Sequence, residues 1–167
     1  VELIYTGQTG WMQGAQYGFI LDATPNDFVS GELEHAILSC HAATGAEWIL
    51  VEGQGALRNP SGPCGAELLI SGRADAVVLQ HVPGRTFYKG WQHTGLKIPP
   101  LADEVALIEQ YGVPVKSVTI NPQGMTAAAA RAFCEAQQAE LNRPVLLPLE
   151  DDLGPVWEAL DQPGPGG

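Results

Sequence analysis

Short apolar runs recur along the chain and alternate with longer amphipathic segments. The runs have the length typical of strands and fall at residues 3–5, 48–51, 76–79, 115–120 and 145–147. Helix signals lie between most of them: Asn26 or Ser30 begins a segment that ends at Gly45. Asp103 opens another expected helix, from Glu104 to Tyr111, which Gly112 and Pro114 close. Strands that alternate with helices predict repeated βα units, a mainly parallel sheet and a three-layer αβα fold.

The clearest predicted helix covers residues 125–141. Thr126 can cap its first turn, its alanines favour helix, and Pro144 follows its end. With 167 residues the chain can bury a sizeable core, and we find neither an internal repeat nor a linker. We therefore predict a single α/β domain over residues 1–161, with residues 162–167 as a flexible tail that has nothing to bury.

The charge and composition argue against several classes of partner. The net charge is −11 and the eight Lys and Arg residues form no basic run, so a nucleic-acid or anionic membrane surface is not expected. The sequence also predicts no membrane span and no signal peptide. Five of the eight cations are Arg58, Arg73, Arg85, Lys89 and Lys97. This group is either ordinary solvated charge or a local pocket for an anionic ligand.

The cysteines point to a reducing compartment. Cys40, Cys64 and Cys134 are odd in number and lack the paired spacing of a zinc site. Neither a disulfide framework nor a zinc centre is therefore predicted, and a cytoplasmic protein is expected.

The strongest functional signal lies where the apolar run 48–51 stops at Glu52 and turns through Gly53 and Gly55. In open α/β sheets, ligands bind just outside the carboxyl ends of the strands. Glu52 can act there as a general base or metal ligand, and the glycine amides can donate to an anion. The alternative is that Glu52 only caps the next turn.

A glycine-rich segment follows the first predicted strand. It contains Thr6, Gly7, Gln8, Thr9 and Gly10. Such a segment can offer N–H donors to phosphate or carboxylate oxygens, or it can be a structural turn. It is not a Walker A loop, because no Lys followed by Ser or Thr completes it.

Two acids, Asp22 and Asp27, lie close to the start of the helix that ends at Gly45. A carboxylate there can cap the helix and complement its dipole. The chemical alternative makes Asp27 a base, or makes Asp22 and Glu52 ligands of Mg²⁺.

Polar residues also follow two later strands. His81, which titrates near neutrality, precedes Arg85, which can hold a carboxylate or phosphate. Asn121 follows the run 115–120 and either contacts a nucleotide base or forms a turn with Pro122. Because these groups all lie at predicted strand ends, we expect them to share a site with Glu52.

Four motifs in this order resemble a known family. They are TGQTG at 6–10, Asp27-Phe28 with Ser30-Gly31, VEGQG at 51–55, and His81 with Pro83-Gly84-Arg85-Thr86. The chain is similar, from residue 1 to about 149, to a bacterial and archaeal family long described as a domain of unknown function and now linked to D-glutamate N-acetyltransferase. Family members look like P-loop proteins related to dethiobiotin synthetase, whose strand-end Val-Glu-Gly is similar to residues 51–53.

The resemblance implies a P-loop NTPase-like fold and transfer of an acetyl group from acetyl-CoA to the amine of D-glutamate, in a homo-oligomer. It also implies that a first strand and phosphate loop belong to an N-terminal portion missing from this chain, which starts at Val1. Two alternatives stay open. One is a ligase or phosphotransferase that uses Mg²⁺ and a nucleotide, and the other is a non-catalytic module that binds anions.

For the acetyl transfer we assign roles by chemistry. Glu52, or Asp27, is the base, and His81 relays a proton. Amides of Gly53 and Gly55 stabilise the oxyanion. The anion contacts are Arg58, Arg85 and Lys89, and the remaining substrate-binding candidates are Thr6, Gly7, Gln8, Thr9, Gly10, Gln54, Ser61 and Asn121.

Overall fold

The structure, a computed structural model, describes residues 1–62 and 65–162. The chain separates into two compact units, unit 1 (Val1–Ala74) and unit 2 (Asp75–Gly167). The single domain predicted for residues 1–161 stays a prediction. Of the predicted flexible tail, only Gln162 lies within the described residues, where its carbonyl accepts a hydrogen bond from Lys116 Nζ at 2.8 Å.

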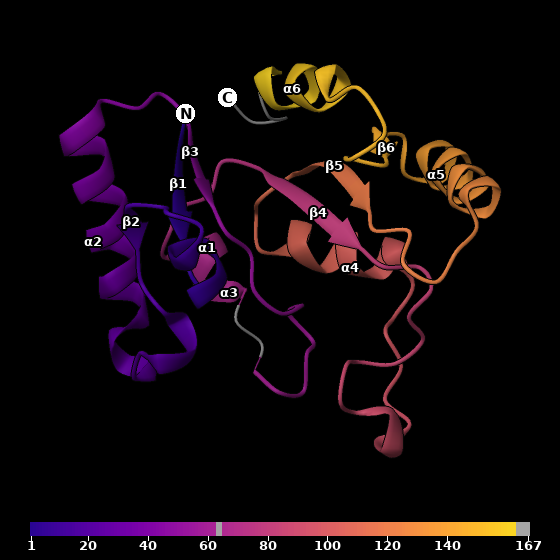
Figure 1. Ribbon diagram of the computed structural model, residues 1–167, viewed down its shortest axis with the longest axis horizontal. Helices are drawn as coiled ribbons and strands as arrows, with labels where there is room; N and C mark the ends of the chain where they lie inside the picture. The colour runs from indigo at the N-terminus through magenta and orange to yellow at the C-terminus, as the bar shows by residue number, and fades with distance from the viewer. Residues whose placement is uncertain (63–64, 163–167) are drawn as a thin grey trace. The chain divides into compact units, whose positions relative to one another are not determined.

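Unit 1 contains a three-stranded parallel sheet with one long helix packed against it (Figure 1). The sheet has the order β2-β1-β3 and consists of β1 (Glu2–Tyr5), β2 (Tyr17–Gly18) and β3 (Ile49–Val51). Its helices are α1 (Gln8–Met12), α2 (Asn26–Thr44) and α3 (Ala66–Ile70), with a 3₁₀ turn η1 (Leu21–Ala23).

Helix α2 supplies most of the core of unit 1. Leu33 on α2 and Ile4 on β1 are fully buried in one cluster. The helix ends where predicted, because Gly45 adopts a left-handed conformation with φ of 63° and donates its N–H to the carbonyl of His41. On the other face of the sheet, Leu3 and Leu50 are opposite each other in register and each remains 42% exposed. The described part of unit 1 therefore covers one face of its sheet.

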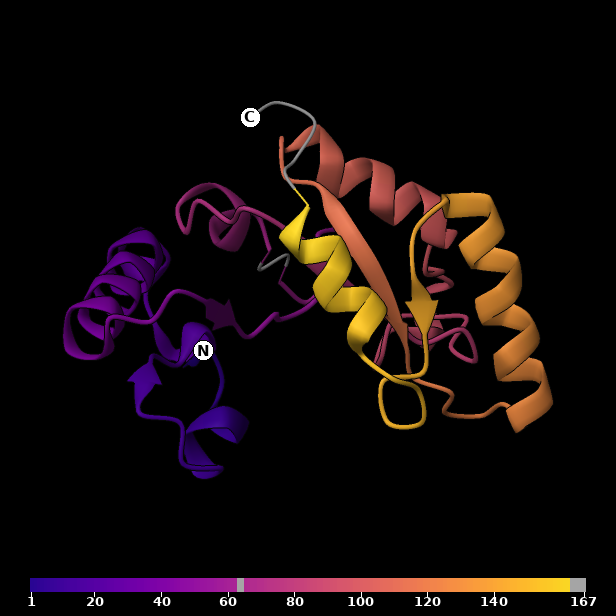
Figure 2. The same ribbon diagram turned by 90° about the horizontal axis from the view of Figure 1, so that it is seen from above.

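Unit 2 contains a second three-stranded parallel sheet, in the order β4-β5-β6. Its strands are β4 (Val77–His81), β5 (Val115–Ile120) and β6 (Val145–Leu146). Its helices are α4 (Leu101–Gln110), α5 (Ala127–Leu141) and α6 (Gly154–Asp161), with a 3₁₀ turn η2 (Gln92–Thr94). Figure 2 shows α5 and α6 on opposite sides of β5, so unit 2 has three layers.

The ends of the helices in unit 2 follow from local chemistry. Thr126 caps α5 by accepting a hydrogen bond from the Ala129 N–H at 3.2 Å, as predicted. Helix α4 begins at Leu101, before the predicted start at Glu104, because Pro100 supplies the extended residue that precedes it. Between β4 and α4 the chain makes a long excursion, seen in Figure 1 as the segment that carries η2.

The predicted α/β fold with parallel strands is confirmed, and all five predicted strands are present. The sequence did not predict β2, α1, α3 and α6, which are short elements of two to eight residues. Their stability comes from packing more than from local propensity. No helix in the described residues is long and apolar enough to span a membrane.

Candidate functional site

A closed network of hydrogen bonds joins the ends of β1 and β3 in unit 1. The Oε2 atom of Glu52 accepts from the backbone N–H of Thr6 at 3.0 Å and of Gly7 at 3.2 Å. The Thr6 hydroxyl donates to the Glu52 carbonyl at 2.9 Å and accepts from Gln54 Nε2 at 2.7 Å. Because Thr6 is 1% exposed, this network fixes the Glu52 carboxylate against the loop that follows β1.

The close approach of the two loops requires glycine at Gly10. A β-carbon there would lie 2.6 Å from the Tyr5 Cβ and 3.2 Å from the Glu52 Oε2. At Gly7 an added β-carbon would lie 3.1 Å from Gln54 Nε2. The glycine-rich segment is therefore a packing surface for Glu52 as well as a turn. It is also partly helical, since residues 8–12 form α1, a helix that the sequence did not predict.

The network leaves hydrogen-bonding groups at the end of β3 for a ligand. Among the described residues, no group donates to the Oε1 atom of Glu52 or accepts from the N–H groups of Gly53 and Gly55. One carboxylate oxygen thus anchors the loop while the other can take a proton. The two backbone donors, Gly53 and Gly55, lie within three residues of Glu52 in the sequence.

The other predicted residues of unit 1 lie near this network in the sequence. Gln8 and Thr9 lie exposed on α1, and Asp27 lies exposed in the first turn of α2, where a carboxylate complements the helix dipole. Asp22 lies exposed in η1. Arg58 and Ser61 are exposed in the segment after Gly55.

The predicted metal role remains a prediction. Within the described residues, no group of three or more His, Cys, Asp or Glu side chains is placed to hold a metal ion.

In unit 2, two predicted residues line one cavity of about 390 Å³. His81 is the last residue of β4, and Arg85 follows a turn closed by its own N–H, which donates to the Val82 carbonyl at 3.0 Å. Burial lowers the pKa of His81 below its ordinary value, because an imidazolium loses hydration there. Burial therefore favours the neutral imidazole, which is the form that can accept a proton from a reacting group.

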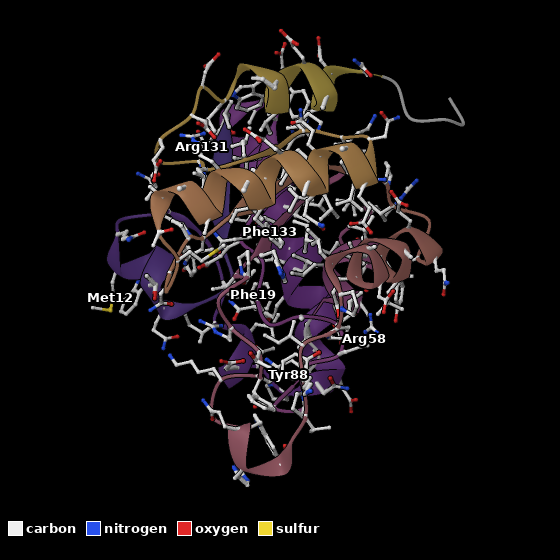
Figure 3. All side chains as sticks on the ribbon, turned by 90° about the vertical axis from the view of Figure 1, so that its right-hand side faces the viewer. Met12, Phe19, Arg58, Tyr88, Arg131 and Phe133 are labelled. Atoms are coloured by element: carbon white, nitrogen blue, oxygen red, sulfur yellow. The ribbon has the colours of Figure 1, made fainter. Side chains whose placement is uncertain are left out.

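The sequence prediction missed the residues that complete this cavity. They include Pro99, Pro100, Phe133 and Glu140. Phe133 stacks on His81, with ring centroids 6.0 Å apart and 18° between the ring planes. Figure 3 shows Phe133 and Arg131 on opposite sides of α5. The spacing of residues 133, 137 and 140 marks one face of a helix and was the available signal.

Asn121 and Lys89 do not line this cavity. The Asn121 side-chain oxygen accepts a hydrogen bond from the Gln123 N–H at 3.0 Å, and this bond closes a turn. The backbone N–H of Asn121 donates to the His81 carbonyl at 2.8 Å. The turn interpretation of Asn121 therefore holds. Lys89 is exposed in the excursion between β4 and α4. The shared site that joins these residues to Glu52 stays a prediction.

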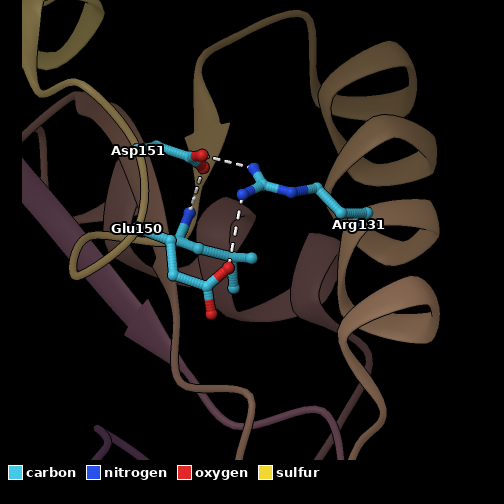
Figure 4. A network of polar contacts seen from close by, with 4 residues as sticks. Arg131, Glu150 and Asp151 are labelled. Atoms are coloured by element: carbon cyan, nitrogen blue, oxygen red, sulfur yellow. Dashed lines mark hydrogen bonds and ion pairs between the residues drawn. The ribbon is translucent and has the colours of Figure 1, made fainter.

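The loop after β6 is fixed by a charged network (Figure 4). Asp151 Oδ2 accepts from the Leu147 N–H at 2.8 Å, and the Arg131 guanidinium contacts Asp151 and, at 3.3 Å, Glu150 Oε2. The Leu147 N–H and then Arg131 lower the pKa of Asp151. Burial raises the pKa of the Cys134 thiol on α5. Cys134 and Cys40 are free, whereas Cys64 lies outside the described residues.

A family model described as "Domain of unknown function (DUF1611_C) P-loop domain" matches residues 1–157. The chain belongs to this family. A solved relative of the family is the crystal structure of a DUF1611 family protein from Anabaena variabilis, with a TM-score of 0.84 and 26% sequence identity. That match covers 95% of this chain and 47% of the relative.

Two curated relatives of this DUF1611 protein carry a functional name. Proteins of Pseudoalteromonas sp. and Tritonibacter scottomollicae, both named "D-glutamate N-acetyltransferase", are each 27% identical to it over 161 and 160 residues, respectively. Each match covers 93% of this chain and 47% of the relative. The chain thus spans about half the length of these relatives. The resemblance inferred from the four motifs is confirmed at the level of the family.

Proposed function

We propose that the full-length protein transfers an acetyl group from acetyl-CoA to the amine of D-glutamate. The observation that carries this proposal is the name shared by both curated relatives, which match 93% of the chain. In the reaction the amine nitrogen attacks the thioester carbonyl, the carbon–sulfur bond breaks, and coenzyme A leaves as a thiol. The proton lost by the ammonium group of the substrate must go to a base.

Glu52 is our candidate for that base. Its Oε2 atom accepts from Thr6 and Gly7, so the carboxylate has a fixed position. Its Oε1 atom accepts no hydrogen bond from any of the described residues. The N–H groups of Gly53 and Gly55 are our candidates for stabilising the oxyanion that forms on the thioester carbonyl. Arg58, Arg85 and Lys89 remain our candidates for contacts with the anionic substrates. Asp27 is the less favoured base because it is exposed and joins no such network.

The substitution Glu52→Gln separates the base role from the structural role. The amide oxygen of glutamine can still accept from Thr6 and Gly7, but glutamine cannot take up a proton. We expect kcat to fall by about 10²–10⁴-fold with little change in KM, as for loss of a general base. Glu52→Ala, the matched variant, should lose activity and also destabilise the loop.

The assay measures D-glutamate-dependent release of the coenzyme A thiol by the full-length protein, with L-glutamate as the control. Absence of release with D-glutamate would refute the proposed reaction. Near-normal turnover of Glu52→Gln would leave the reaction standing but remove Glu52 as its base.

One observation favours a second candidate. The family is described as a P-loop domain, and such domains commonly bind nucleotide phosphates. A ligase or phosphotransferase of this kind predicts Mg²⁺-dependent binding of ATP by the full-length protein, with Glu52 near the metal. Calorimetric titration with ATP, in the presence and absence of Mg²⁺, separates this candidate from the acetyltransferase. A non-catalytic anion-binding module predicts ligand affinity that is unchanged in Glu52→Gln.

A further inference from the structure

The cavity of unit 2 is open to solvent on one side and has the volume of a small-molecule site. Its volume of about 390 Å³ falls within the range of ligand pockets, roughly 300–1,000 Å³. Three sides come from separate elements: the end of β4, the segment that leads into α4, and one face of α5. Most of the lining is apolar, including Pro99, Pro100 and Leu101. A cavity of this kind gains binding energy from an apolar or aromatic body.

The aromatic part of the wall carries no charge at neutral pH. His81 and Phe133 stack, and burial lowers the pKa of His81, which keeps its ring neutral. Pro99 and Pro100 add rigid surfaces without N–H groups. Nothing in this part of the wall requires a polar ligand.

The excursion between β4 and α4 is tied at its base, next to the cavity. Phe87 and Lys97 form an antiparallel bridge, and the Ile98 N–H donates to the Thr86 carbonyl at 2.9 Å. These contacts join the two ends of the excursion, so Arg85, which precedes it, and Pro99, which follows it, keep fixed positions at the cavity. The cavity is thus preformed, and a ligand spends little binding energy on ordering it.

The two charged side chains that line the cavity differ in the hydrogen bonds they make. Glu140 Oε2 already accepts from Gln137 Nε2 at 2.8 Å. The Arg85 side chain, in contrast, makes no hydrogen bond or ion pair with any described residue. Arginine pairs well with carboxylate and phosphate oxygens because its guanidinium can donate two parallel hydrogen bonds. Glu140 keeps its negative charge but forms no ion pair with Arg85, so the Arg85 guanidinium is the group of this cavity that is left to pair with an anion.

We propose that this cavity binds an amphipathic anion, whose planar or apolar body lies against Phe133 and Pro100 and whose carboxylate or phosphate pairs with Arg85. D-glutamate is a poor fit, because it has charged groups at both ends and no apolar body. The site belongs to unit 2 alone, and the proposal does not depend on acetyl transfer.

The test is an NMR titration of the 167-residue chain that follows the imidazole C–H signals. The chain has four histidines, and only His81 is in the cavity. The probes are phenyl phosphate and phenylacetate, which distinguish phosphate from carboxylate. Phenylacetamide has the same ring as phenylacetate without the charge, and D-glutamate has charge without the ring. We expect saturable shifts of the His81 signals with at least one aromatic anion, and at least tenfold weaker binding of phenylacetamide and D-glutamate.

The variants Arg85→Ala and Lys97→Ala form a matched pair, since both remove an exposed cation of the same chain segment and only Arg85 lines the cavity. Arg85→Ala should weaken binding of the aromatic anion about tenfold or more, and Lys97→Ala should change it less than about twofold. The affinity of the unmodified chain should also fall as the salt concentration rises. The proposal is overturned if neither aromatic anion shifts His81, if phenylacetamide or D-glutamate binds as well, or if the two variants behave alike.

Discussion

The tight contact between α1 and the end of β1 makes Gly10→Ala the most direct test of the Glu52 network. A methyl group at position 10 would lie 2.6 Å from the Tyr5 Cβ, where carbon atoms normally stay about 3.5–4.0 Å apart. It would also lie 3.2 Å from the Glu52 Oε2. Overpacking of this kind typically costs about 1–3 kcal/mol. We expect α1 to shift outward and the hydrogen bonds from Thr6 and Gly7 to Glu52 to weaken.

Gly31→Ala provides the matched control. Gly31 lies within α2, and a β-carbon there meets nothing within 4 Å. Both substitutions replace a helical glycine by alanine, which by itself stabilises a helix by about 0.5–1 kcal/mol. Because this gain is common to both variants, their difference in free energy of unfolding isolates the overpacking cost, about 1–3 kcal/mol.

Urea denaturation measures this difference. With an m-value of about 2 kcal/mol/M, the midpoint of Gly10→Ala should lie roughly 0.5–1.5 M below that of Gly31→Ala. Amide hydrogen exchange provides a local measurement, in which Thr6 and Gly7 should lose protection in Gly10→Ala only. Equal midpoints, or a higher midpoint for Gly10→Ala, would refute the argument that the network depends on glycine at this position.

Three further predictions concern unit 2. Asp151→Ala should lower the free energy of unfolding at least twice as much as Arg131→Ala, because it removes the acceptor of the Leu147 N–H as well as an exposed ion pair; equal losses in urea contradict this. Thr126→Ala should cost about 1 kcal/mol through the lost cap of α5, whereas Thr126→Ser should be nearly neutral by the same measurement. An NMR pH titration should give His81 a pKa below about 6.5. Between that lower folded pKa and about 6.5, the unfolded chain binds more protons than the folded chain does, so the free energy of unfolding falls as the pH falls through this window. A pKa of 6.5 or above for His81 in the folded protein would contradict this prediction.

Much of the fold could be predicted because its signals are local. The apolar run 115–120 forms β5 over the same residues, and Thr126 and Gly45 mark helix ends through hydrogen bonds within one turn. Elements without such signals were missed. Helix α1 has only five residues and includes a glycine, so its stability depends on contacts with β1 that no local pattern records.

The sequence alone determined that Glu52 ends a strand beside glycines and that the chain resembles its family, because both are properties of residue order. Only the tertiary structure decided what these residues contact. Folding brings Thr6 to within hydrogen-bonding distance of Glu52, 46 positions away, and it stacks Phe133 on His81 across an intervening strand and helix. Partners so far apart in the chain are chosen by the topology of the sheet and the packing of helices on it, which local propensity does not encode.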